Sequence, residues 1–306
     1  MNAHVTALLC GLVGLVLSAA AEETELIGDP SFQRGFVLLR PETGKKVECG
    51  TVLAPDAKAA AWQLAQWSSK NPLDGTTPLV KAASGGLRLS NPARSVSFGG
   101  NDGILTLAVN TAEEYGDRPR AEGEPWVHLL VEQPIARPPR LGDLHSLRLQ
   151  LEARKIRARL ARADGHDPER HAAQFLLFLS LQNLEKDSPG YGNYLWFGVP
   201  IFDNRHRTSE TYSAQDFGGT GKFIHTPATK HFTAGSTHDA GWVKFNADLL
   251  PLIREGLAVA RSKGFLKGTD GDDLLRVAAM NMGWEVPGTF DVEMQVRGLS
   301  LISTPR

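Results

Sequence analysis

The chain has little cysteine, little net charge and only one long apolar run. Two of its 306 residues are cysteine, and its formal net charge at pH 7 is −1. This balance gives no basic excess that would indicate a nucleic-acid partner. Cys10 lies in the amino-terminal apolar run, so removal of that run would leave Cys49 alone and exclude an intrachain disulfide. The fold must then be stabilised by a packed core, and a chain of this length can bury one.

The apolar run itself has the features of a secretion signal. Residues 1–21 lack Asp, Glu, Lys and Arg, and the run from Ala7 to Leu17 ends in Ser18-Ala19-Ala20-Ala21. Small residues at 19 and 21 fit a signal-peptidase site, although no Lys or Arg precedes the run. The run is shorter than the roughly 20 residues that span a bilayer. We expect a signal peptide over 1–21 and a secreted or periplasmic protein with no membrane span after cleavage; a buried helix or an anchor is the alternative.

Several catalytic and metal-binding signatures are missing. The sequence has no Gly-x-Ser-x-Gly elbow, the motif that carries the nucleophilic serine of α/β-hydrolases. His225, His231 and His238 are spaced more widely than zinc ligands, so we interpret them as surface histidines and predict no metal site. The segment 270–273 (Asp-Gly-Asp-Asp) offers oxygen ligands without the pattern of an EF-hand loop, which leaves a structural calcium open. No other cofactor is predicted.

Short runs of alternating apolar and polar residues dominate the rest of the chain. Roughly ten such runs are separated by Gly, Pro and Asn, as in antiparallel sheets. Helical spacing occurs once: Leu249, Ile253 and Leu257 follow Asp248, a good capping residue, and the pattern ends by Gly264. The sequence therefore predicts an all-β, antiparallel sandwich with one short helix near residues 248–263. We expect residues 22–306 to form a single domain.

One stretch, residues 190–202, is unusually rich in aromatic residues. Its alternation places Leu195, Phe197, Val199 and Ile201 on one face and Tyr194, Trp196, Gly198, Pro200 and Phe202 on the other. Aromatic rings stack on the C–H faces of sugars, and polar groups bind their hydroxyls. The predicted ligand-binding residues are Tyr194, Trp196, Asp203, Arg205 and His206. The alternative is that the rings are core under the long polar segment 203–240. Trp62 and Trp67 are weaker ligand candidates.

The overall layout resembles the jelly-roll sandwiches of secreted carbohydrate-active proteins, such as concanavalin-like and galactose-binding-like domains. The resemblance rests on Trp62-x4-Trp67 and on residues 126–133, 194–202, 241–245 and 283–293, and covers most of the mature chain. It implies a jelly-roll fold with one concave sheet face. It also implies a polysaccharide or oligosaccharide as the ligand.

Two glutamates suggest a possible chemistry, but they do not decide whether the chain is an enzyme. Glu132 and Glu285 each alternate with apolar residues on a strand, where a solvated or salt-bridged Glu is the ordinary interpretation. In an enzyme they would be the acid–base or nucleophile pair of glycoside hydrolysis. A lyase would instead use residues such as His128, Tyr194, Arg205 and His206. Our first hypothesis is a carbohydrate-binding protein, the second a polysaccharide-degrading enzyme, and the third an envelope interaction protein.

Overall fold

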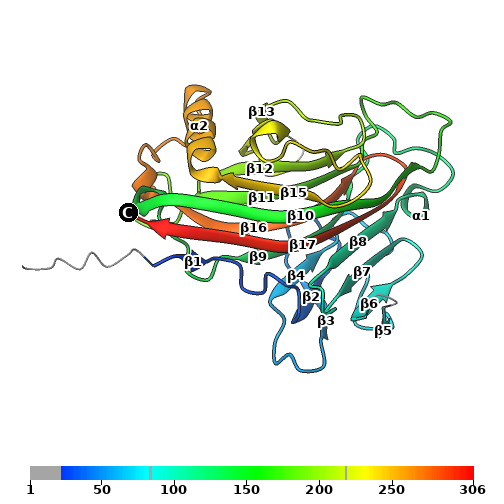
Figure 1. Ribbon diagram of the computed structural model, residues 1–306. Coiled ribbons are helices and arrows are strands. Elements are labelled where there is room, and N and C mark those ends of the chain that lie inside the picture. The colour runs from blue at the N-terminus through cyan, green and yellow to red at the C-terminus, as the bar shows by residue number, and fades with distance from the viewer. Residues whose placement is uncertain (1–21, 83–84, 218) are drawn as a thin grey trace, which may run out of the picture.

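The computed structural model describes residues 22–82, 85–217 and 219–306. Two β-sheets pack face to face (Figure 1), which confirms the predicted jelly-roll β-sandwich. The signal peptide predicted at residues 1–21 lies outside the described residues. Within the described ranges, no helix is long and apolar enough to cross a membrane.

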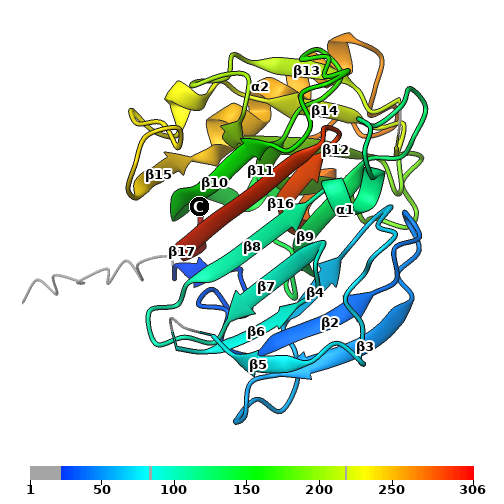
Figure 2. The ribbon, with the colours of Figure 1, turned by 90° about the vertical axis from the view of Figure 1, so that its right-hand side faces the viewer.

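Sheet A contains eight strands, and Figure 2 shows most of them side by side. Their order is β15, β10, β17, β8, β7, β6 and β5, with β1 paired to β17. The bounds are β1 Thr24–Glu25, β5 Leu79–Lys81, β6 Leu87–Ser90, β7 Arg94–Phe98, β8 Leu105–Asn110, β10 Leu144–Leu160, β15 Val243–Asp248 and β17 Phe290–Pro305.

Sheet B contains nine strands in the order β13, β14, β12, β11, β16, β9, β4, β2 and β3. Two neighbouring pairs, β12–β14 and β2–β4, are parallel, so this sheet is mixed although most of its pairs are antiparallel as predicted. The bounds are β2 Gly35–Leu39, β3 Glu48–Leu53, β4 Trp62–Ala65, β9 Val127–Pro134, β11 Gln174–Asn183, β12 Tyr194–Asp203, β13 Tyr212–Gln215, β14 Phe223–Thr226 and β16 Leu275–Val286.

The predicted helix is confirmed as α2, Leu249–Ser262, which covers one end of the sandwich (Figure 1). The side chain of Asp248 caps it by accepting a hydrogen bond from the backbone N–H of Leu250 at 3.1 Å. The apolar spacing of the sequence places one face of α2 in the core. The remaining helical segments are short: α1 Ala112–Tyr115 and the 3₁₀ turns η1 Leu141–Asp143, η2 Thr229–His231 and η3 Asp272–Leu274.

The core lies between the two sheets, and on β12 it follows the predicted alternation only up to a bulge. Leu195, Phe197 and Val199 are fully buried. Further along, Phe175 pairs with Phe202 whereas Leu176 pairs with Pro200, so one extra residue stands in β12. A bulge of this kind reverses the faces beyond it. The prediction for Phe202 is therefore wrong: its ring packs inward against Trp284, with ring centroids 5.9 Å apart.

Candidate functional site

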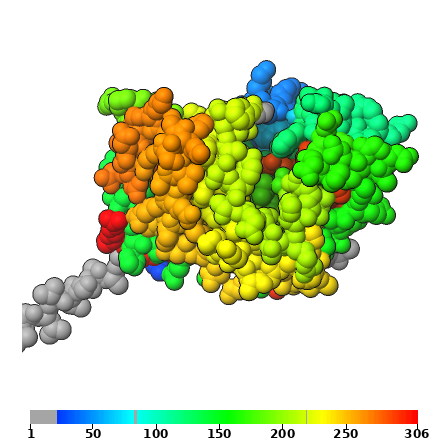
Figure 3. Space-filling view, turned by 90° about the horizontal axis from the view of Figure 1, so that it is seen from above, coloured from blue at the N-terminus to red at the C-terminus, as the bar shows by residue number. Residues whose placement is uncertain are grey.

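The outer face of sheet B, directed away from sheet A, is hollowed. Figure 3 shows a depression between the yellow-green chain around residues 205–217 and 219–222 and the blue and green segments opposite it. Atoms on its floor have the green and orange-red colours of β11 and β16. The side chains that alternate with the core residues of these strands point to this face. The depression is therefore where a ligand could reach the sheet.

A row of four polar side chains crosses this face on adjacent strands. The strand register pairs Gln174 of β11 with both Asp203 of β12 and Glu285 of β16, and it pairs Glu285 with His128 of β9. Gln174 donates a hydrogen bond to Asp203 at 2.7 Å. The Nε2 atom of His128 lies 4.0 Å from Oε2 of Glu285. Two predicted site residues, Asp203 and Glu285, thus belong to one row.

Glu285 is held in an environment that favours its neutral form. Only 19% of its side chain is exposed. Burial raises the pKa of this carboxyl, while the nearby His128 lowers it and the negative charge of Asp216 raises it again. A carboxyl with a raised pKa can remain protonated where ordinary glutamates are ionised. Such a group can donate a proton.

His128 is fixed in orientation by three hydrogen bonds. Its Nδ1 atom lies 2.9 Å from the carbonyl oxygen of Trp126, which can only accept, so Nδ1 carries a proton. Its backbone N–H donates to the carbonyl of Trp67 at 3.0 Å, and its own carbonyl accepts from Arg94 at 3.2 Å. In the neutral ring, Nε2 then presents a lone pair toward Glu285. The imidazole can accept a proton from that side.

A buried ion pair lies beneath His128 and stabilises this arrangement. The side chains of Arg94 and Glu114 are almost completely buried and paired with each other. Glu114 also accepts hydrogen bonds from the Ser69 hydroxyl and the Lys70 backbone N–H, each at 2.7 Å. The pair therefore connects β7, α1 and the segment after Trp67 to the backbone of His128. This support was not predictable from the sequence, because its partners are distant along the chain.

The aromatic end of the site lies further along β12 and is partly covered. The indole N–H of Trp196 donates to Thr220 Oγ1 at 3.1 Å, and the Lys222 ammonium lies 5.4 Å from the centre of the Tyr194 ring. The two rings meet edge to face with centroids 5.1 Å apart. Burial raises the pKa of Tyr194. Both rings are half-buried under the turn between β13 and β14, an arrangement intermediate between the predicted binding surface and a closed core.

The five predicted ligand residues do not gather at one point. Tyr194 and Asp203 are the first and last residues of β12, which separates them by about 30 Å at roughly 3.3 Å per residue. Asp203 is buried and holds Arg205 in an ion pair of 2.7 Å. Burial opposes ionisation of Asp203, but the hydrogen bonds from Arg205 lower its pKa overall. Arg205 and His206 are exposed at this end.

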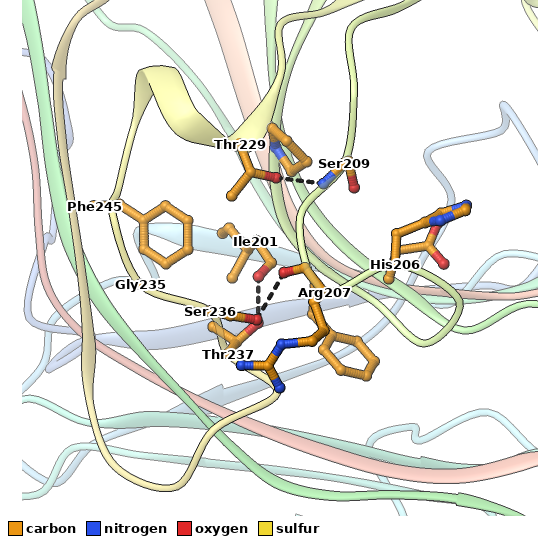
Figure 4. Close-up of a pocket in the computed structure, with 12 residues that line it drawn as sticks. Ile201, His206, Arg207, Ser209, Thr229, Gly235, Ser236, Thr237 and Phe245 are labelled. Carbon is orange, nitrogen blue, oxygen red and sulfur yellow. Dashed lines mark hydrogen bonds between the residues drawn. The ribbon is translucent and has the colours of Figure 1, made fainter.

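A small cavity next to His206 does not provide the binding site. Its volume is about 10 Å³, which is room for a single water. Figure 4 shows its lining, where the Ser236 and Thr237 hydroxyls donate to the carbonyls of Arg207 and Ile201 at 2.7 and 2.6 Å. The first bond joins two parts of the 203–240 segment, and the second fastens this segment to β12. A sugar ring does not fit in this cavity.

Glu132 lies on the same face but is offset from Glu285. It stands opposite Asn281 in the register, four residues from Glu285, which corresponds to about 13 Å along the strands. Its carboxylate pairs with the ammonium of Lys46 at 2.7 Å. The other tryptophan candidates separate as well: Trp67 is half-buried near His128, whereas Trp62 is core, 1% exposed, and donates to the carbonyl of Asp29 at 3.0 Å.

Asp216 is a site residue that the sequence reasoning missed. It belongs to the turn between β13 and β14, where its carboxylate accepts hydrogen bonds from the backbone N–H and the hydroxyl of Thr220 at 2.7 and 2.8 Å. Its charge acts on both Glu285 and Tyr194. Through Thr220, which also accepts from the indole N–H of Trp196, Asp216 is tied to the aromatic part of the face. The length of the polar segment 203–240 was the only signal in the sequence.

The possible metal ligands are otherwise engaged or dispersed. Asp272 pairs with Arg254 at 3.2 Å and with Arg261 at 3.7 Å. His225 is buried, which corrects its interpretation as a surface residue. No group of three or more His, Cys, Asp or Glu side chains suited to a metal ion occurs in the described part of the chain.

Comparisons with known proteins give a likeness of layout only. No family model and no curated protein matches the sequence. Among solved structures, an endoglucanase (Cel12A) from Rhodothermus marinus matches at 11% identity over 76% of this chain and 98% of its own, with a TM-score of 0.43. A family 12 xyloglucanase from Bacillus licheniformis matches at 12% identity over 81% and 100%, also at 0.43. These values are too low to carry an argument about activity.

The chemistry of the site follows from its own residues. Glu285 is a carboxyl whose pKa is raised by burial, His128 is a fixed imidazole beside it, and the charge of Asp216 acts on the same carboxyl. Aromatic rings that could hold a sugar lie along the same face. The arrangement suits proton transfer to a ligand bound on this face.

Proposed function

We propose that this chain is a secreted polysaccharide-degrading hydrolase that uses Glu285 as its general acid. The observation that supports this most is the raised pKa of Glu285 on the floor of the hollowed face. Burying an ionisable carboxyl costs stability unless it is hydrogen-bonded or paired, and groups perturbed in this way cluster at functional sites. A module that only binds sugar needs no proton donor. Catalysis thus accounts for a feature that binding alone leaves unexplained.

In the proposed reaction, Glu285 donates its proton to the glycosidic oxygen as the bond to the sugar carbon breaks. The imidazole of His128, with Nε2 4.0 Å from Oε2 of Glu285, favours the ionised carboxylate electrostatically and takes up no proton in this step. Asp216 activates the attacking water as the second carboxylate. Glu132, the partner expected from the sequence, would take this role only after its ion pair with Lys46 opens.

The polymer would lie in the depression across the outer face of sheet B. Tyr194 and Trp196 supply the stacking surface at one end, after a small movement of the turn that covers them. Arg205 and His206 supply exposed polar groups for hydroxyls at the other end, with Arg205 held in place by Asp203. A depression lined in this way suits a chain of several sugars better than a single sugar.

Products of incubation with a panel of polysaccharides, identified by mass spectrometry, test the proposal. Hydrated oligosaccharides should form with the native protein and with Glu293→Gln, a matched change at a Glu that pairs with Arg157 on sheet A. The rate at which these products form should fall by about 10²–10⁴-fold in the Glu285→Gln variant.

The other outcomes overturn the hydrolase and select its alternatives. Unsaturated products would indicate a lyase. Retention on a glycan without any product would indicate the carbohydrate-binding protein. Neither retention nor products, together with copurifying proteins, would favour an envelope interaction protein.

A further inference from the structure

A second polar row crosses the opposite side of the molecule, on the outer face of sheet A. The strand register aligns Arg154, Gln295, Thr106, Ser97 and Arg88 on β10, β17, β8, β7 and β6, strands that Figure 2 shows side by side. Neighbouring residues of the same strands, such as Ala153, form the core, so this row faces away from it. Four strand spacings of about 4.8 Å give it a length of roughly 19 Å.

The arginines of this row differ from the other arginines on the same face. Arg157 pairs with Glu293 at 2.8 Å, Arg159 with Asp291 at 3.1 Å, and Arg297 with Glu152 at 2.6 Å. In the part of the chain that the structure describes, neither arginine at the ends of the row, 154 and 88, has a carboxylate within 4.0 Å. Two arginines are therefore left without a carboxylate partner on a face where three neighbouring arginines have one.

Arg154 is held ready to bind an anion. Its guanidinium lies 4.7 Å from the centre of the Trp242 ring, and its Nε and Nη2 atoms both donate to the amide oxygen of Gln295, at 3.2 and 2.5 Å. The Gln295 amide nitrogen in turn lies 3.4 Å from the Thr106 hydroxyl, which orients its oxygen toward Arg154. A neutral acceptor leaves the charge of the guanidinium in place. Stacked arginines with free N–H groups bind carboxylates with little loss of entropy.

We propose that this row is a second binding site, for an acidic polysaccharide that carries carboxylate groups. Between the two arginines, the Gln295 amide can meet sugar hydroxyls, whereas Ser97 and Thr106 are largely buried and form the floor of the row. The arginines match carboxylates at the two ends. Nucleic acid is less suitable, because it requires many neutralised phosphates and the row offers two free cations. The site does not depend on the proposed hydrolase activity, since it lies on the other sheet.

Native gel electrophoresis with polygalacturonate in the gel tests this proposal. The native protein should be retarded by polygalacturonate and not by a neutral polymer that is not a polysaccharide, such as polyvinylpyrrolidone. Arg154→Gln and Arg88→Gln should each weaken this binding on the order of tenfold, the usual effect of losing one charge-assisted hydrogen-bonded pair. Trp242→Ala should weaken it in the same direction by releasing Arg154.

Arg159→Gln is the matched control, because it removes the same charge from an ion-paired residue of the same face. It should leave retardation nearly unchanged. Equal weakening by Arg159→Gln, equal retardation by single-stranded DNA, or no retardation of the native protein would overturn the proposal. Circular dichroism of each variant shows whether a loss of binding reflects misfolding. An Arg154→Gln protein that is folded and binds polygalacturonate as well as the native protein would also overturn the proposal.

Discussion

Replacing Glu285 by Gln should make the protein more stable at neutral pH while it removes the proposed activity. Because the folded-state pKa of Glu285 is raised, the folded protein binds this proton more tightly than the unfolded chain. The stabilising effect is complete at a pH below the ordinary glutamate range and is lost as the pH rises through the folded-state pKa. Glutamine has nearly the shape of the protonated acid and does not ionise, so the variant avoids this loss.

The size of the effect follows from the pKa shift. Each unit by which the pKa is raised corresponds to about 1.4 kcal/mol of unfolding free energy at high pH. For a domain of this size, about 1 kcal/mol moves the melting temperature by roughly 2–4 °C. The side chain is 19% exposed, so solvent screening removes only part of this energy.

Urea unfolding of both proteins between pH 4 and pH 8 measures the difference. The two curves should meet at low pH and diverge as the pH rises, with Glu285→Gln the more stable. Because the charge of His128 acts on Glu285, the same comparison in a His128→Asn background separates the contribution of this imidazole. A variant that is equally or less stable than the native protein at pH 8, in both backgrounds, would refute the reasoning.

Three further predictions concern the support and the ends of the site. Glu114→Gln leaves the buried Arg94 without its charge partner and should lower the free energy of unfolding by about 3–5 kcal/mol, measured in urea. The rate of polysaccharide cleavage should also fall, because His128 loses its support. An unchanged unfolding midpoint would contradict this. Gly256→Ala would place a Cβ atom 2.6 Å from the His225 ring. This overpacking should lower the free energy of unfolding by about 1–3 kcal/mol in the same assay. A variant more stable than the native protein would show that α2 can shift to make room. Trp196→Ala should weaken retention on the polysaccharide that is cleaved on the order of tenfold in an affinity gel, and unchanged retention would remove this ring from the site.

The sequence was sufficient for the architecture wherever local periodicity decides it. The alternation along β12 predicted the buried Leu195, Phe197 and Val199, and the spacing after Asp248 predicted α2. It failed at Phe202, because a single extra residue in a strand reverses its faces and leaves no mark in the composition.

The site was only partly predictable, because its members come from distant segments. Glu285 could be singled out as a polar residue among apolar strand residues. The proximity of Asp216 and the support of His128 by Arg94 depend on how the sheets and turns pack, which no local pattern encodes. Trp62 and Trp67 show the same limit: they are five positions apart, yet one is core and the other lies at the rim of the site.

The most direct test of the central claim compares two substrates that differ in their need for an acid. A polysaccharide has a sugar alcohol as leaving group and requires protonation, whereas a dinitrophenyl oligosaccharide has a leaving group that departs without it. If Glu285 is the proton donor, Glu285→Gln should lose about 10²–10⁴-fold in kcat/KM on the polysaccharide and retain most of its activity on the dinitrophenyl substrate. An equal loss on both substrates, or no loss on the polysaccharide, would contradict the account.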